Sequence, residues 1–232
     1  MNPEDPNIEL LTHMAEALGD LRERLVFVGG CATALLITDR AAPPVRATHD
    51  VDAVVATASL PEYQQLGKTL RERGFVQTVE GGEPPYRWTR GGMKLDVMPI
   101  SDAVLGFSNR WYESAMREAA MVQLADGLII RLVAPVHFIA TKLVAFDDRG
   151  RGDYLESHDL EDVLAVVDGR PELVDELAQA EPSLRAYVAT VVARLTADAG
   201  FLNALPGLII EGSPAERMPV VLGRLKTIAA MR

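Results

Sequence analysis

The sequence predicts an α+β or α/β protein in which a mixed sheet flanked by helices is followed by a C-terminal bundle of helices. Short apolar runs that stop at glycine alternate with helical patterns over residues 1–134, whereas residues 135–232 contain helical patterns only. A chain of 232 residues is long enough for one large or two modest domains. We therefore predict an α/β domain over 1–134 and a helical domain over 135–232.

The first half begins with a helix near residues 6–18, where Ile8, Leu11, Met14 and Leu18 have helical spacing. A short buried strand then stops at Gly29 and Gly30, and a helix is expected over residues 31–39. The elements expected after it are a buried strand at 51–56, a helix at 61–74, strands at 75–80, 86–90 and 93–100, and a hairpin at 120–133 with Asp126–Gly127 at its turn.

The second half is predicted to be helical throughout. Its expected helices cover residues 136–147, 157–168, 171–179, 183–198 and about 214–231. The most apolar stretch, near residues 127–146, is interrupted by Arg131, Pro135, His137 and Lys142, which argues against a membrane span.

Charge and cysteine content restrict the functional classes. The net charge of −10 argues against nucleic-acid binding through the overall field, so any contact with RNA has to be local. Cys31 is the single cysteine, so an internal disulfide is impossible. Together with an acidic N-terminus unlike a secretory signal, this predicts a cytoplasmic protein.

Three aspartates lie in two apolar strands. Asp50 and Asp52 are two residues apart, so they point to the same side of their strand, and Asp96 lies in the strand predicted at 93–100. If these strands are neighbours, the three carboxylates converge, and a shared proton or a bound cation must offset their repulsion. Oxygen ligands of this kind suit Mg²⁺ or Mn²⁺. The alternative is that Asp50 caps an element and Asp96 is a surface acid on an edge strand.

The two glycines precede the aspartates at a turn from strand to helix. Such a turn exposes backbone N–H groups, which bind phosphate well, although glycine at this position can also serve packing alone. Two glycines at a turn, then a D-x-D strand, then a third aspartate on a later strand form a combination. This combination indicates a site for phosphate and a cation more specifically than any one of these features alone.

Residues 25–168 resemble the DNA polymerase beta-like nucleotidyltransferase superfamily, and within it the AbiEii/AbiGii toxins of abortive-infection and toxin–antitoxin systems. The stretches that carry the resemblance are "VGG", "RATHDVD", "KLDVMP" and "ATKLVAFDDRGRGDYLESHDLEDVLAVV". The resemblance implies a nucleotidyltransferase-like sheet, a helical domain that completes the cleft, the use of two Mg²⁺ or Mn²⁺ ions, and a nucleoside triphosphate (NTP) as substrate.

The resemblance also implies roles for individual residues. Asp50, Asp52 and Asp96 would be catalytic and hold the metal ions, with Asp96 as the general base. The residues implied to bind the nucleotide are Gly29, Gly30, Cys31, Lys142 and Asp159. Arg46 is a further nucleotide-binding candidate, because it precedes the aspartates with the same alternation and could contact a phosphate. Asp162 is a neighbouring candidate for the role of Asp159, which is to orient Lys142 or the substrate.

Two positions depart from the family pattern. Cys31 stands where serine is usual, and a thiol is a weaker hydrogen-bond donor to phosphate. His158 stands where the toxins commonly have arginine, which removes a permanent cation. Lys142 could also be a helix residue with a buried aliphatic stem, and Arg46 a solvated loop arginine.

The sequence leaves the acceptor open. The acceptor hydroxyl could belong to tRNA, to a protein or to a small molecule such as an antibiotic, and a cognate antitoxin is a possible partner. Two rival functions remain: a non-catalytic relative that binds a nucleotide or a partner protein, and a glycosyltransferase with a D-x-D motif, which would leave Asp96 and the glycine turn unexplained.

Overall fold

A computed structural model of the protein describes residues 5–77, 84–124, 127–149, 153–209 and 214–231. The chain forms two compact units. The sheet unit contains residues 2–32 and 47–134, and the helical unit contains residues 33–46 and 135–232. Residues 33–46 come early in the chain but belong to the unit formed by its second half. The domain division predicted at residue 134 stays a prediction.

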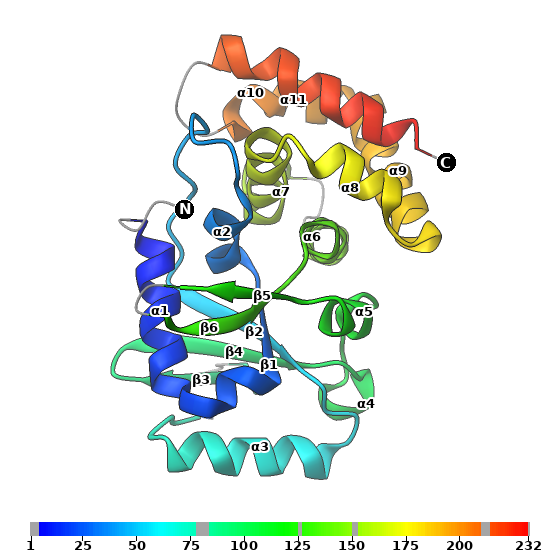
Figure 1. The fold of residues 1–232 in the computed structure, drawn as a ribbon. Coiled ribbons are helices and arrows are strands. Elements are labelled where there is room, and N and C mark those ends of the chain that lie inside the picture. The colour runs from blue at the N-terminus through cyan, green and yellow to red at the C-terminus, as the bar shows by residue number, and fades with distance from the viewer. Residues whose placement is uncertain (1–4, 78–83, 125–126, 150–152, 210–213, 232) are drawn as a thin grey trace. The chain divides into compact units, whose positions relative to one another are not determined.

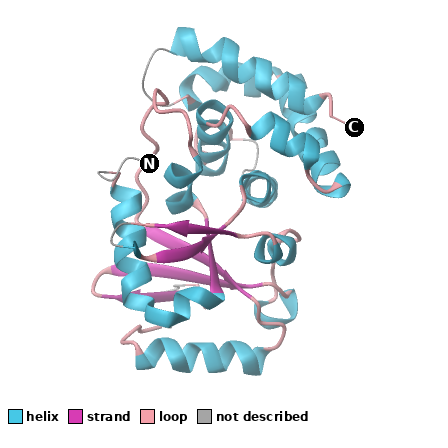
Figure 2. Cartoon of the chain, in the orientation of Figure 1, coloured by secondary structure: helices cyan, strands magenta, loops and turns pink. Residues whose placement is uncertain are grey.

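The sheet unit is built on one six-stranded mixed sheet with the strand order β3-β4-β2-β1-β6-β5. Figure 2 draws the strands of this sheet in magenta. β1 is antiparallel to β2 and parallel to β6, β2 is parallel to β4, and the pairs β3/β4 and β5/β6 are antiparallel. The strands are β1 (Leu25–Val28), β2 (Asp50–Val55), β3 (Arg87–Arg90), β4 (Met93–Pro99), β5 (Ala120–Gln123) and β6 (Ile129–Leu132). The predicted mixed sheet is confirmed.

Helices flank this sheet. They are α1 (Pro6–Leu18), α3 (Leu60–Glu72), α4 (Asp102–Leu105) and α5 (Tyr112–Arg117), with 3₁₀ turns η1 (Gly19–Arg24) and η2 (Gly30–Ala32). Figure 1 shows α3 running along the sheet, and Gly67 of α3 lies so close to β3 that a Cβ there would be 3.0 Å from the Trp88 ring. Trp88, Leu95 and Phe27 are almost fully buried, so this side of the sheet is the apolar core.

The helical unit consists of helices, as predicted for residues 135–232. They are α2 (Thr33–Leu36), α6 (Pro135–Arg149), α7 (His158–Gly169), α8 (Leu173–Gln179), α9 (Pro182–Ala197), α10 (Ala199–Leu208) and α11 (Pro214–Ala229). The Gly169 carbonyl oxygen accepts the backbone N–H groups of Thr38 and Asp39 at 3.0 and 2.9 Å. These hydrogen bonds tie residues 33–46 to the end of α7.

Some local predictions were wrong. The helix expected over 31–39 is a 3₁₀ turn followed by the single turn of α2, and α4, α5 and α10 were not predicted. In the strand expected at 75–80, Val76 forms an isolated bridge to Thr89, and residues 78–80 lie outside the described residues. The predicted hairpin is β5/β6, but Asp126 of its turn is also outside them.

Within the described ranges, no single helix is both long and apolar enough to cross a membrane. α9 and α10 reach that length and composition only when they are taken together, and the chain bends by 96° between them.

Candidate functional site

The three predicted aspartates lie on the same side of the sheet unit. β2 and β4 are neighbours, and their register places Asp52 directly beside Asp96. Asp50 is two residues before Asp52 and therefore points to the same side, in register with the exposed Lys94. Adjacent strands are about 4.8 Å apart, so these carboxylates share one small area. Two unit charges about 4 Å apart repel by about 4 kcal/mol at an effective dielectric of 20.

Arg87 on β3 neutralises part of this charge. It lies opposite Asp96 in the β3/β4 register, and its Nε and Nη2 atoms donate to Asp96 Oδ1 and Oδ2, both at 2.7 Å. The same Nη2 reaches Asp50 Oδ2 at 3.2 Å. Two parallel bonds from one guanidinium are the strongest arrangement an arginine makes with a carboxylate. Asp96 is only 5% exposed, so this contact is largely shielded from water.

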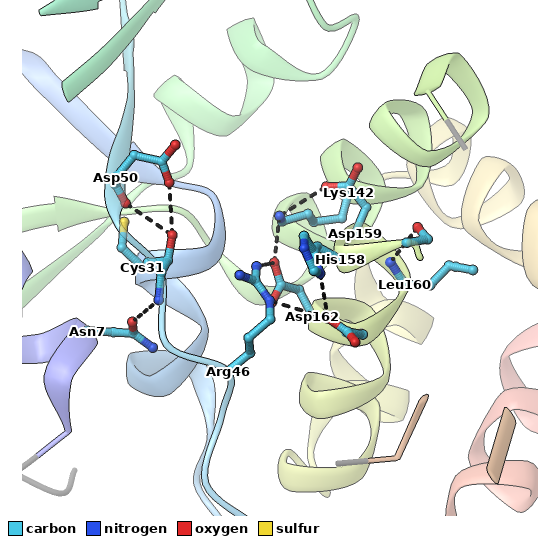
Figure 3. Close-up of polar contacts among 12 residues, drawn as sticks. Asn7, Cys31, Arg46, Asp50, Lys142, His158, Asp159, Leu160 and Asp162 are labelled. Atoms are coloured by element: carbon cyan, nitrogen blue, oxygen red, sulfur yellow. Dashed lines mark hydrogen bonds and ion pairs between the residues drawn. The ribbon is translucent and has the colours of Figure 1, made fainter. Parts of the chain in front are cut away.

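Asp50 is positioned from the preceding loop as well. The Thr48 hydroxyl donates to Asp50 Oδ1 at 2.9 Å, and the Thr48 backbone N–H donates to Oδ1 of the buried Asn7 at 2.8 Å. Figure 3 shows Asn7 and Asp50 at the two ends of this chain of contacts. The first turn of α1 thus fixes the loop that leads into β2.

Gly29 provides the space that Asp52 occupies. Its φ is +73°, a conformation that favours glycine, and a Cβ at this position would lie 1.9 Å from Asp52 Oδ2. The turn after β1 therefore requires glycine for two reasons, backbone conformation and the approach of a carboxylate.

Gly30 and Cys31 lie in the 3₁₀ turn after Gly29. Cys31 is fully buried, and its thiol donates to the Val28 carbonyl oxygen at 3.2 Å. That hydrogen bond gives the thiol a role in closing the turn. The helix after it is too short to supply a substantial dipole, so a phosphate here would depend on the turn's own N–H groups. Contact of these residues with a nucleotide stays a prediction.

The sheet carrying Asp96 is supported from its other side by Tyr63 of α3. The Tyr63 hydroxyl donates to the Val97 carbonyl oxygen at 2.8 Å. Burial is the main cause that raises the pKa of Tyr63 to about 12. The phenol is therefore neutral at physiological pH and acts as a hydrogen-bond donor under β4.

The three carboxylates are chemically suitable ligands for a divalent cation. Asp50, Asp52 and Asp96 offer hard oxygen ligands from adjacent strands, the kind that Mg²⁺ and Mn²⁺ bind. In the described part of the chain, however, no three acidic, histidine or cysteine residues are already grouped as a metal site. Arg87 holds both oxygens of Asp96, so a cation that uses Asp96 has to compete with a guanidinium.

The predicted lysine and its acid belong to the helical unit. Lys142 Nζ on α6 lies 3.1 Å from Asp159 Oδ1 and 2.7 Å from Asp162 Oδ2, both on α7 (Figure 3). Asp159 and Asp162 are 9% and 3% exposed. The ammonium therefore links the two helices through buried carboxylates. Its action on a nucleotide stays a prediction.

Other charged side chains surround this pair. Arg46 Nε lies 3.3 Å from Glu161 Oε2, and its Nη2 lies 3.6 Å from Asp162 Oδ2. Arg149 Nη2 lies 2.8 Å from Asp159 Oδ2, and His158 contacts Glu161 at 2.8 Å. Arg46 is thus held by α7 rather than being a solvated loop arginine.

Arg87 is the residue of the site that the sequence prediction missed, although the sequence contains a signal for it. Gly91 and Gly92 form a two-residue turn between β3 and β4, and both have positive φ angles of 56° and 85°. A turn of this length fixes the register of the strands on either side, which places Arg87 opposite Asp96.

Comparison with known proteins found no matching protein-family model and no matching curated protein. Solved structures with similarity include an antigenic nucleotidyltransferase-like protein from Paracoccidioides brasiliensis. It is 21% identical, with 80% of this chain and 93% of that chain covered and a TM-score of 0.45.

The antibiotic-resistance factor ANT(2'')-Ia is also similar. Its solution structure is 15% identical over 82% of this chain and 93% of that chain, with a TM-score of 0.46. Its crystal structure in complex with adenylyl-2''-tobramycin is 14% identical, with 81% of this chain and 97% of that chain covered and a TM-score of 0.45. TM-scores below 0.5 do not establish a shared fold, so the chain's own residues carry the functional argument.

Proposed function

We propose that the protein is a metal-dependent nucleotidyltransferase that transfers a nucleoside monophosphate from an NTP to an acceptor hydroxyl. The observation that carries this proposal is the register of β2 against β4. It sets Asp52 beside Asp96, with Asp50 on the same side and the Gly29 turn packed against Asp52. Three carboxylates gathered at a glycine turn need a cation, and a triphosphate bound there brings one.

The proposed reaction is a single displacement at the α-phosphorus of the NTP. The acceptor oxygen forms a bond to the α-phosphorus, the bond from that phosphorus to the β-phosphate oxygen breaks, and pyrophosphate leaves. Asp50 and Asp52 would hold the divalent cations, which supply charge stabilisation at the phosphorus. Asp96 would accept the proton of the acceptor hydroxyl, using an oxygen lone pair that its hydrogen bonds from Arg87 leave available.

The substrate range is part of the proposal. The acceptor is an RNA 3′ end, a protein hydroxyl or a small molecule such as an antibiotic. The resemblance over residues 25–168 supports an AbiEii/AbiGii-type toxin acting with an antitoxin. Toxicity on expression that requires Asp52 would support that role, whereas harmless expression of an active enzyme would favour a small-molecule acceptor.

A labelling experiment tests the proposal. The protein is incubated with Mg²⁺ and each of four NTPs labelled at the α-phosphate, together with separate pools of RNA, protein and aminoglycosides. We expect label on one pool and equimolar pyrophosphate. The same assay on Asp52→Asn should show no transfer, while Asp175→Asn, which changes an exposed acid of α8, should retain it.

A second candidate is a non-catalytic protein that binds a nucleotide. It is favoured by one observation, that Arg87 already holds both oxygens of Asp96. Calorimetric titration with NTP and Mg²⁺ separates the two functions, since binding without pyrophosphate release in every pool would favour this candidate. Turnover of nucleotide sugars in place of NTPs would instead indicate a glycosyltransferase.

A further inference from the structure

Arg87 bridges two of the three carboxylates of the proposed metal site. Its Nε and Nη2 take Asp96 Oδ1 and Oδ2 at 2.7 Å, and Nη2 also lies 3.2 Å from Asp50 Oδ2. The Arg87 side chain is 20% exposed, so the contact forms in a partly desolvated setting. A guanidinium that is planar and always charged is well suited to hold two carboxylates at once.

The oxygens that Arg87 binds are the ones a metal ion would need. Asp50 Oδ1 is occupied by Thr48 and Asp50 Oδ2 by Arg87, while both oxygens of Asp96 face the guanidinium. A carboxylate oxygen has a second lone pair and could bind both partners in principle. A divalent cation beside a guanidinium is nevertheless repelled by it, so the two positive groups compete for the same negative charge.

We propose that Arg87 is an exchangeable counter-ion that sets the cation affinity of the carboxylate site. Asp50 and Asp96 pair with Arg87 in one arrangement and with a divalent cation in the other. Arg87 thereby stabilises the sheet unit without added cation and weakens cation binding, so that the site takes up metal only when the concentration of cation is sufficient. This inference rests on the proposed function, because it assigns regulation to the same site.

Direct binding of Mn²⁺ tests the exchange, measured from the electron paramagnetic resonance signal of the free ion. Arg87→Gln removes the competing charge, and we expect it to bind Mn²⁺ at least about tenfold more tightly than the wild-type protein. Arg71→Gln is the matched control. It makes the same charge change at an exposed α3 residue that stacks on Trp88, on the other side of the sheet, and its affinity should be unchanged.

Thermal unfolding gives a second readout. In chelator, Arg87→Gln should melt at a lower temperature than wild type, because three carboxylates then repel each other. Saturating Mn²⁺ should raise its melting temperature by more than it raises that of wild type. If Arg87→Gln does not fold, Arg87→Lys retains a charge but loses the paired hydrogen bonds, and we expect a smaller gain in Mn²⁺ affinity.

The outcomes separate this inference from the proposed function. In one outcome, the wild-type protein binds Mn²⁺, Asp52→Asn abolishes this binding, and the Arg87 variants show no gain or a loss of affinity. This outcome overturns the counter-ion role of Arg87 but supports the metal site. No Mn²⁺ binding in any protein overturns both. Binding by Arg87→Gln alone supports the inference, because the arginine then prevents binding in the wild-type protein.

Discussion

The two units hold their charged clusters in different ways. In the sheet unit, the guanidinium of Arg87 binds Asp50 and Asp96, and Asp52 lies beside Asp96. The three acids keep a net negative charge even when Arg87 and the exposed Lys94 are both counted. In the helical unit, the described residues of the cluster contain as many cations as acids. The acids are Asp159, Glu161 and Asp162, and the cations are Arg46, Lys142 and Arg149.

This difference indicates which cluster needs a partner from solution. A cluster of partly buried ion pairs with equal numbers of acids and cations needs no ion from solution. Removing one of its side chains lowers stability, because the charge that remains loses its partner. An unbalanced group of carboxylates gains stability when a cation binds. We therefore expect added Mg²⁺ or Mn²⁺ to protect the sheet unit and to leave the Lys142 cluster unaffected.

The largest expected effect is at Gly29. Gly29→Ala imposes left-handed strain of about 1–2 kcal/mol and also places a methyl group against Asp52, so the free energy of unfolding should fall by about 3–5 kcal/mol. Gly91→Ala separates the two causes, because Gly91 has a φ of +56° but nothing within 4 Å of an added Cβ. Denaturant unfolding of Gly91→Ala should show a decrease of about 1–2 kcal/mol in the free energy of unfolding. Equal losses at both positions would contradict the close packing of Asp52 on the turn.

The second effect tests the balanced cluster. Lys142→Met leaves Asp159 and Asp162 facing each other without the ammonium, and the free energy of unfolding should fall by about 3 kcal/mol. Lys226→Met makes the same change at an exposed site of α11 and should cost less than about 0.5 kcal/mol. Chelator or Mg²⁺ should not alter either value. A Mg²⁺-dependent loss would mean that the helical cluster also binds cations.

The third effect is a pH dependence of the sheet unit. Because the folded pKa of Tyr63 is raised to about 12 above an unfolded value of about 10, its contribution to stability is complete below pH 10. The contribution is lost as the pH rises through this window, up to about 3 kcal/mol in all. Unfolding measured from pH 9 to pH 12 should show a shallower fall in Tyr63→Phe than in wild type.

Tyr154 of the helical unit is the comparison for that experiment. Burial and its hydrogen bond to Asp198 raise the pKa of Tyr154, but this residue is only partly buried. Tyr154→Phe should therefore change the same pH profile less than Tyr63→Phe. The reverse order would show that the phenol under β4 is accessible to water.

The smallest effect is expected at the rim of the helical cluster. The Arg149 side chain is 70% exposed although it contacts Asp159, and an exposed pair contributes about 0.5 kcal/mol or less. Arg149→Gln should therefore leave denaturant unfolding almost unchanged. A loss comparable to that of Lys142→Met would show that the two cations are equally important.

The sequence was sufficient for the features that depend on short-range patterns. Alternation in the strands placed Asp50 and Asp52 on one side, and the apolar runs predicted β1, β2 and β4. The convergence of the three aspartates required β2 and β4 to be neighbours. The sequence alone could not establish this, because strand order depends on packing between distant segments. The structure meets that condition.

The missed features depend on tertiary contacts or on signals that were not used. α10 contains Gly200, Pro206 and Gly207, which argue against a helix, but Asp198 caps it and its buried side chains pack in the helical unit. Asp162 was already a candidate partner of Lys142 through the resemblance, but periodicity alone does not specify that α6 and α7 lie together, as this ion pair requires. Arg87 could have been found from the turn at Gly91 and Gly92.

The membership of residues 33–46 in the helical unit has a consequence for protein synthesis. The chain passes between the units at residues 32/33, 46/47 and 134/135, so the early segment emerges from the ribosome long before α7. Until the Gly169 carbonyl is made, Thr38 and Asp39 lack their native hydrogen-bond acceptor. A nascent chain stopped at residue 134 therefore carries an apolar segment, Leu36 and Ile37 included, whose packing surface at the end of α7 has not yet been made.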